Sequence, residues 1–181
     1  MAKEQPEAFN NVMQWIICAI CLVVVGGILS PLVLVNRPVR HQAAVISNLK
    51  QIGTDSLIYS DDYDNRLPEA RKWMDAFGEY GLNEAIYTDP SVHRPAKGEY
   101  GFAFFARLSR FDREGLAHPE EVPLAFQSRD LRWNASGGLE LLPSPPREAG
   151  SHVVVHADSS CRSYRPEAIH GKRIQLELAK K

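Results

Sequence analysis

The stretch WIICAICLVVVGGILSPLVLV, residues 15–35, contains no charged side chain. As a helix these residues would be about 32 Å long, which is enough to cross the hydrocarbon core of a bilayer. The preceding tail, residues 1–14, carries one lysine against two glutamates and so lacks the basic n-region of a cleaved signal peptide. The sequence therefore predicts an uncleaved, single-pass transmembrane helix over 15–35, with the lipid bilayer as partner and the cell membrane as location.

The rest of the chain has the size and composition of one globular domain. About 145 residues follow the apolar stretch, enough to bury a core without covalent cross-links. The formal net charge of the chain is −1, with 21 basic and 22 acidic residues, which argues against a nucleic-acid partner. Cys18 and Cys21 lie in the apolar stretch and Cys161 is alone in the domain, so no disulfide framework is expected.

A second helix is expected directly after the apolar stretch. Pro38 disfavours helical geometry at the residue before it, which predicts a kink near 36–38. Residues 36–60 then have the apolar period of an amphipathic helix that must pack against something. The members of the stripe are Val45, Leu49, Ile52, Ser56 and Tyr59.

Residues 61–181 are expected to form a small domain. The polar run at 61–65 predicts a turn, and a short helix is expected at 70–80. Strand patterns occupy residues 100–107, 122–127, 152–156 and 173–178. The expected fold class is α+β: a long N-terminal helix, with its first half in the membrane and its second half packed on a small antiparallel sheet.

Two runs within residues 47–68 resemble a known family. Residues 47–53 read SNLKQIG and residues 59–68 read YSDDYDNRLP. These runs are similar to a block in the pilin-like proteins of planctomycetes and verrucomicrobia that carry a prepilin-type H-X9-DG domain. Residues 153–160, VVVHADSS, resemble that family's terminal strand motif. Glu148 stands where the pattern has histidine, Asp158 keeps its aspartate, and Ser159 replaces its glycine.

The resemblance implies a bacterial cell-envelope protein of the type IV pilin or pseudopilin kind, as found in secretion systems. Such a protein assembles through its N-terminal helix, and its domain lies outside the cytoplasm. The basic residues that follow the apolar stretch indicate the opposite orientation. The family's processing glycine and helix glutamate would fall at Phe9 and Gln14, so the processing site is incomplete.

One group of candidate metal ligands lies on the strand predicted at 152–156. His152, His156 and Asp158 share one face of an extended strand, where imidazole and carboxylate groups could hold a metal. The two histidines would lie about 13 Å apart along an ideal strand, which is far for two ligands of one ion. Surface histidines that bind no metal explain the same pattern.

A second group of candidate ligands lies in the turn after the amphipathic helix. Asp61, Asp62 and Asp64 could provide carboxylate oxygens for calcium. The spacing differs from that of an EF-hand, and no bidentate glutamate follows. A solvated turn that ends the helix explains the same residues.

No catalytic residue or cofactor site is predicted. The chain lacks a G-x-S-x-G elbow and a glycine-rich phosphate loop. We therefore expect a non-enzymatic, membrane-anchored, pilin- or pseudopilin-like protein that assembles with itself or with other pilin-like subunits. The small residues Gly26, Gly27 and Ser30 would allow close approach of helices. The alternative is a monomeric, membrane-anchored domain that binds a ligand or metal.

Overall fold

The structure is a computed structural model that divides the chain into two compact units, Met1–Val39 and Arg40–Lys181. The backbone is described for residues 7–35, 37–80, 83–147 and 150–171. Side chains are described for residues 13–27, 41–80, 83–147 and 150–169.

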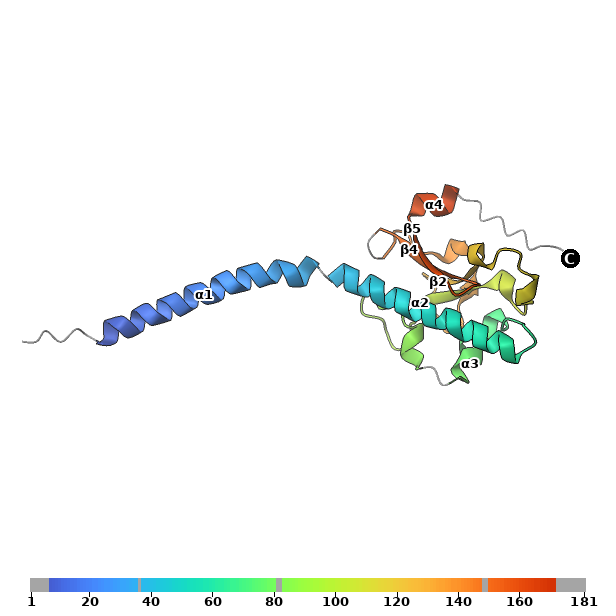
Figure 1. Cartoon of the computed structure of the whole chain (residues 1–181), viewed down its shortest axis with the longest axis horizontal. Helices are drawn as coiled ribbons and strands as arrows, with labels where there is room; N and C mark the ends of the chain where they lie inside the picture. Colours follow the sequence, from blue (N-terminus) through green and yellow to red (C-terminus); the bar gives the residue numbers. More distant parts are fainter. Residues whose placement is uncertain (1–6, 36, 81–82, 148–149, 172–181) are drawn as a thin grey trace, which may run out of the picture. The chain divides into compact units, whose positions relative to one another are not determined.

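The first unit contains helix α1, Glu7–Val35 (Figure 1). The predicted transmembrane helix over 15–35 is wrong, because within the described residues no helix is long and apolar enough to cross a membrane. The predicted single-pass topology and location in the cell membrane are wrong for the same reason.

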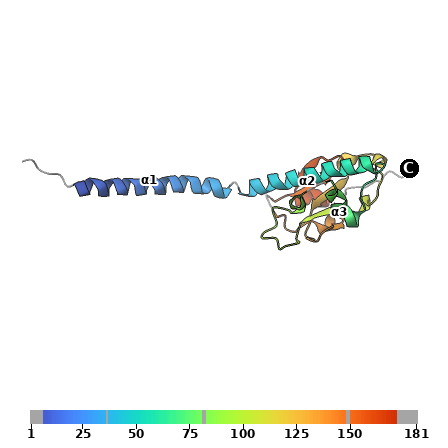
Figure 2. The same ribbon diagram turned by 90° about the horizontal axis from the view of Figure 1, so that it is seen from below.

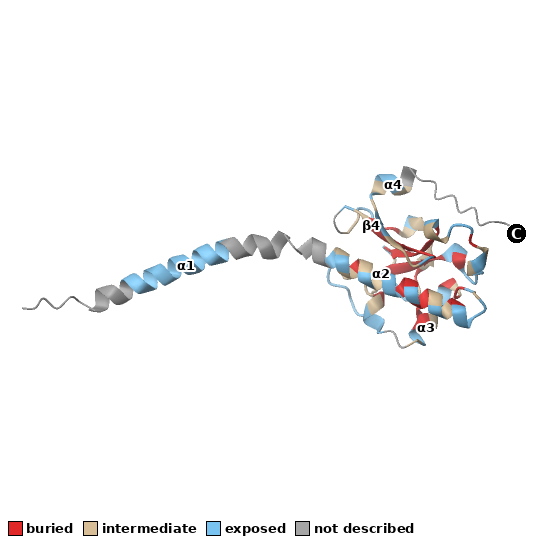
Figure 3. Cartoon of the chain, viewed as in Figure 1, coloured by how far each residue is buried: buried red, intermediate tan, exposed pale blue. Residues whose placement is uncertain are grey.

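The prediction of one long helix is wrong as well. The structure has two separate helices here, α1 and α2 (Arg37–Asp62). The predicted kink near 36–38 includes Asn36, which lies outside the described residues. The amphipathic character of α2 is confirmed, since Val45, Leu49 and Ile52 are fully buried while the opposite face is exposed (Figure 3).

The second unit contains a five-stranded sheet with the order β3-β1-β2-β4-β5. Its strands are β1 (Phe102–Phe105), β2 (Pro123–Gln127), β3 (Ser136–Gly137), β4 (His152–His156) and β5 (Cys161–Tyr164). We predicted an antiparallel sheet, and this is wrong, because the sheet is mixed. The chain passes from β2 to the far side of β1, so that β3 pairs with β1 in parallel, while the other pairs are antiparallel.

Three of the four predicted strands are confirmed as β1, β2 and β4. Residues 173–178, where a further strand was predicted, lie outside the described residues. Strand β5 was not predicted, because its sequence CRSY is short, mostly polar and partly exposed at the edge of the sheet. Its pairing with β4 is what makes it a strand.

Short helices surround the sheet, and α2 runs along one side of it (Figures 1 and 2). The predicted helix at 70–80 is confirmed as η1 (Ala70–Lys72) followed by α3 (Trp73–Gly78). The indole of Trp73 is fully buried, stacks on Phe104 and donates a hydrogen bond to the carbonyl of Ala135 at 3.0 Å. The remaining short helices are η2 (Glu84–Tyr87), η3 (Ala106–Leu108), η4 (Arg113–Gly115), η5 (Pro119–Glu121), η6 (Leu139–Leu141) and α4 (Pro166–Gly171).

Gly53 determines how closely α2 approaches the sheet. A Cβ atom at this position would lie 2.8 Å from the Oγ of Ser159, 2.8 Å from a methyl group of Val155 and 3.1 Å from the Cα of Ser159. Contacts this short require either the helix or the end of β4 to move. Glycine is therefore the residue that allows α2 to lie directly against the end of β4.

We predict that Gly53→Val lowers the free energy of unfolding by about 1–3 kcal/mol, because the added methyl groups overpack the interface between α2 and β4. Urea denaturation measures the change. Gly78→Val is the matched control, since a Cβ at Gly78 meets no atom within 4 Å. Equal stability of Gly53→Val and the parent protein would show that α2 does not lie this close to the sheet.

Candidate functional site

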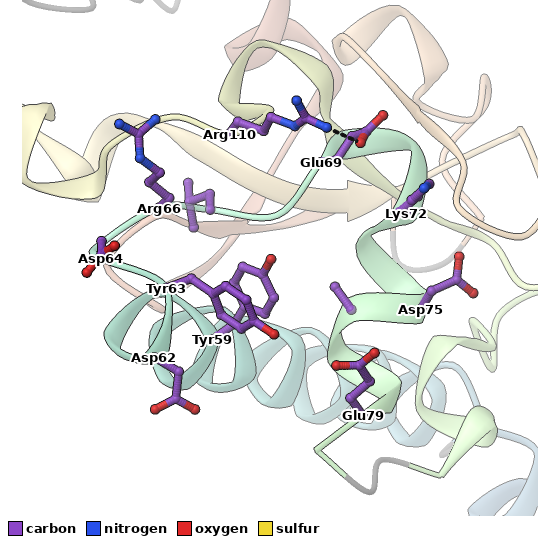
Figure 4. A pocket seen from close by; sticks show the side chains of 12 residues that line it. Tyr59, Asp62, Tyr63, Asp64, Arg66, Glu69, Lys72, Asp75, Glu79 and Arg110 are labelled. Atoms are coloured by element: carbon purple, nitrogen blue, oxygen red, sulfur yellow. Dashed lines mark hydrogen bonds and ion pairs between the residues drawn. The ribbon is translucent and has the colours of Figure 1, made fainter.

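A cleft of about 550 Å³ lies between the C-terminal end of α2, the turn that follows it and helix α3 (Figure 4). We call it the tyrosine cleft. The residues that decide its chemistry are Tyr59, Asp62, Tyr63, Arg66, Lys72 and Glu79. Most of them come from the end of α2 and the turn, within the block that resembles the pilin-like family.

Two tyrosines form the apolar surface of the tyrosine cleft. Tyr59 and Tyr63 are one helical turn apart, and their rings stack with centroids 4.2 Å apart and an interplanar angle of 11°. Tyr59 also packs edge-on against the buried ring of Phe77. Tyr63 is 45% exposed, so its ring presents an aromatic face to a bound molecule.

Charges of both signs surround the two rings. Acidic and basic side chains are interspersed around the cleft (Figure 4): Asp62, Asp64, Glu69, Asp75 and Glu79, and Arg66, Lys72 and Arg110. Arg110 forms an ion pair with Glu69 at 2.6 Å. Such walls suit a ligand or protein segment that itself carries charges of both signs.

Tyr80 follows α3 and contacts one residue of the tyrosine cleft. Its hydroxyl donates a hydrogen bond to a carboxylate oxygen of Asp62 at 2.9 Å. Desolvation and this hydrogen bond together raise the pKa of Tyr80 to about 12. The hydrogen bond ties the end of α2 to the segment that follows α3.

The turn after α2 depends on two residues in the left-handed region. Asp64 has φ 52° and Asn65 has φ 60°, conformations that aspartate and asparagine tolerate better than most residues. The backbone N–H of Asn65 donates to the carbonyl of Ser60 at 2.7 Å, and its side-chain amide donates to Glu114 at 2.9 Å. The reversal directs Arg66 and Leu67 along the tyrosine cleft.

The three aspartates proposed as calcium ligands have separate environments. Asp61 forms an ion pair with Arg113 at 2.8 Å, Asp62 accepts the hydrogen bond from Tyr80, and Asp64 lines the tyrosine cleft. Across the described side chains, no group of three histidine, cysteine, aspartate or glutamate residues is placed to hold a metal ion. The turn thus holds its acidic side chains apart.

The candidate ligands on β4 are also not brought together. His156 is buried, and its Nδ1 lies 3.2 Å from the carbonyl oxygen of Ser160, so Nδ1 must donate. Its Nε2 then accepts from the hydroxyl of Tyr164 at 3.0 Å. Burial lowers the pKa of His156, which favours this neutral tautomer. His152 is buried at the other end of β4, and Asp158 accepts from the backbone N–H of Ser160.

A buried ion pair that the sequence did not indicate supports the loop before β1. The carboxylate of Asp89 is fully buried and lies 2.6 Å from a guanidinium nitrogen of Arg147. The side-chain amide of Gln127 and the hydroxyl of Ser91 donate to the same carboxylate. With its oxygens satisfied in this way, Asp89 has a structural role. Asp89 and Arg147 lie far apart in sequence, and no spacing pattern links them.

Asp55 is a buried carboxyl group that lacks such compensation. It lies on α2 and is 6% exposed, and its Oδ2 has no hydrogen-bond partner in the described structure. Burial raises the pKa of Asp55 from 3.8 to about 6. Because the folded state disfavours the ionised form, the carboxyl stabilises the fold fully below about pH 4, and this stabilisation is lost as the pH rises through 6.

We predict that the free energy of unfolding of Asp55→Asn, minus that of the parent protein, is about 2 kcal/mol larger at pH 7.5 than at pH 4. The reason is that the parent carboxyl must ionise in a buried position at the higher pH, whereas asparagine does not. Urea denaturation at both pH values gives the two differences. Glu79→Gln, at an exposed carboxylate on the tyrosine cleft, is the control and should leave the pH profile unchanged. A pH-independent difference for Asp55→Asn would mean that Asp55 ionises as easily in the folded chain as in the unfolded one.

Comparison of this chain with protein-family models, with curated proteins and with solved structures finds no match. The resemblance of residues 47–68 to the pilin-like family therefore stays a prediction from the sequence. Function has to be inferred from the surfaces of the two units.

Proposed function

We propose that this chain is a non-enzymatic, pilin- or pseudopilin-like subunit that assembles with copies of itself through α1. The observation that carries the proposal is that every described side chain of α1, residues 13–27, is exposed. None of these residues carries a charge. The resemblance of residues 47–68 to the pilin-like family supports the same function.

The apolar surface of α1 is too continuous to remain in water. Its large exposed side chains are Met13, Trp15, Ile16, Ile17, Ile20, Leu22, Val23, Val24 and Val25. Helices that are apolar on all sides are found buried, and contiguous apolar patches of this kind mark interaction sites. Identical α1 helices from other copies offer a surface of the same chemistry, so a bundle of them buries each helix.

Gly26 adds a place where two helices can approach closely. A Cβ atom at Gly26 would meet no heavy atom within 4 Å, so the backbone is accessible to a second helix. The distance between packed helices depends on the size of the side chains at the contact. Gly27 and Ser30 extend this stretch of small residues in the sequence, and the side chain of Ser30 lies outside the described residues.

The tyrosine cleft gives the domain a further surface for binding. Its tyrosines and charges suit binding of a neighbouring subunit or ligand.

We predict that the full chain self-associates and that the double substitution Ile20→Lys with Val24→Lys weakens association at least tenfold. The two residues lie one turn apart on α1, so the lysines would place two charges in the helix contact. Sedimentation velocity over a range of concentrations measures the effect. Ile58→Lys is the matched control, because Ile58 is a similarly exposed isoleucine on α2.

A parent chain that remains monomeric at concentrations of tens of micromolar would contradict the proposal. So would a double variant that associates as strongly as the Ile58→Lys control. Either result would favour the second candidate function, a ligand-binding domain that acts through the tyrosine cleft. The feature in its favour is the exposed ring of Tyr63 between charges of both signs.

We further predict that Gly26→Leu weakens self-association about tenfold, because the larger side chain separates helices that meet at this glycine. Val25→Leu is the control, since it enlarges a neighbouring exposed residue without filling a glycine. The same sedimentation experiment measures both. Unchanged association of Gly26→Leu would place the helix contact elsewhere on α1.

A further inference from the structure

A second hollow lies in the domain, apart from the residues of the tyrosine cleft. It has a volume of about 230 Å³ and is lined by Gly78, Glu84, Tyr87, Tyr100 and Trp133. We call it the aromatic pocket. Three of its five lining residues are aromatic, and they come from η2, the segment before β1 and the segment before β3.

The three rings are packed at angles to one another. The ring of Trp133 lies 4.8 Å from that of Tyr100, with an interplanar angle of 62°, and 5.4 Å from that of Tyr87, with an angle of 87°. These are edge-to-face geometries of the kind that aromatic pairs prefer. Rings at such angles form separate walls and do not lie in one flat stack.

Hydrogen bonds hold the walls of the aromatic pocket in place. The indole N–H of Trp133 donates to one oxygen of Asp75 at 2.7 Å, and the amide of Asn134 donates to the other oxygen at 2.6 Å. The hydroxyl of Tyr100 donates to Glu84. Tyr87 is fixed by burial, with 1% of its surface exposed. The pocket is therefore organised before any ligand arrives.

The charges at the aromatic pocket are acidic. Glu84 is the charged residue among those that line it, and Asp75 lies behind Trp133. Burial and the nearby charges of Asp55 and Asp75 raise the pKa of Tyr87. No lysine or arginine is among the described lining residues. A cation that enters would meet the rings of Tyr100 and Trp133 together with a carboxylate, since Tyr87 is almost fully buried behind them.

We propose that the aromatic pocket binds an alkylated ammonium group, of the kind found in a choline headgroup or a methylated lysine side chain. Such a cation is weakly hydrated and is recognised by aromatic rings. A small metal ion needs several oxygen or nitrogen ligands, and the lining residues supply one carboxylate. The pocket lies in the second unit, so this inference does not depend on assembly through α1.

Gly78 is a lining residue with room for a larger side chain. A Cβ atom at this position meets no atom within 4 Å, so Gly78→Leu adds a bulky group at the hollow without a clash of its Cβ atom. Trp133→Leu removes one wall, and Glu84→Gln removes the charge while keeping an acceptor for Tyr100. Tyr63→Leu removes an exposed aromatic residue outside this pocket and serves as the matched control.

The test is saturation-transfer NMR on the full chain with tetramethylammonium chloride, in the presence of tert-butanol as a neutral molecule of similar shape. Salt is held constant with sodium chloride. We expect saturable transfer to the tetramethylammonium methyl groups and at least tenfold weaker binding of tert-butanol. Trp133→Leu and Glu84→Gln should each weaken binding about tenfold, Gly78→Leu should abolish it, and Tyr63→Leu should leave it unchanged.

Equal binding of tert-butanol would overturn the proposal by showing an apolar site without preference for charge. Binding that survives both Gly78→Leu and Trp133→Leu would place the site elsewhere and overturn it as well. Choline and trimethyllysine amide distinguish two sources of the same group. If either ligand binds, the proposal is supported. If neither ligand binds, the proposal is overturned. Binding of each ligand is read from the ligand's own methyl signals. The readout is therefore the same whether the chain is assembled or monomeric.

Discussion

The close packing of α2 against β4 is the constraint on which the rest of the domain depends. Gly53 allows the helix backbone to lie against Val155 and Ser159, and the stripe of Val45, Leu49 and Ile52 is buried as a result. A larger residue at Gly53 would lift the helix away from the sheet. The position of α2 then fixes where its last turn and the following reversal lie, and with them the tyrosine cleft.

Some buried polar groups strengthen this arrangement and others weaken it. Asp89 with Arg147, and His156 with Ser160 and Tyr164, have their hydrogen-bonding atoms paired. Asp55 is buried on α2 with an oxygen that lacks a partner. A carboxyl group in this state stabilises the fold only while it is protonated. Asp55 therefore costs the fold stability at neutral pH.

The two units present surfaces of opposite kinds. The described surface of α1 is apolar on all sides, which suits contact with other helices. The domain instead offers two hollows in which aromatic rings stand beside charges. The proposed self-assembly and the proposed recognition of a small group thus involve different residues and are compatible in one molecule.

The sequence by itself determined the local elements with strong periodicity. The spacing of Val45, Leu49 and Ile52 predicted the buried face of α2, and apolar runs predicted β1, β2 and β4, because these signals depend only on neighbouring residues. The apolar composition of residues 15–35 predicted a membrane span, and this was wrong. Composition alone does not decide this, because within the described residues no helix is long and apolar enough to cross a membrane.

Only the tertiary structure decided which distant residues meet. The polar strand β5, the parallel pairing of β3 with β1 and the ion pair of Asp89 with Arg147 all depend on contacts between segments far apart in the chain. The aspartates of the turn and the ligands proposed on β4 are close in sequence, yet the fold directs them to different partners. Tyr87, Tyr100 and Trp133 are remote in sequence, and folding places them around one pocket, because packing joins surfaces without regard to their order along the chain.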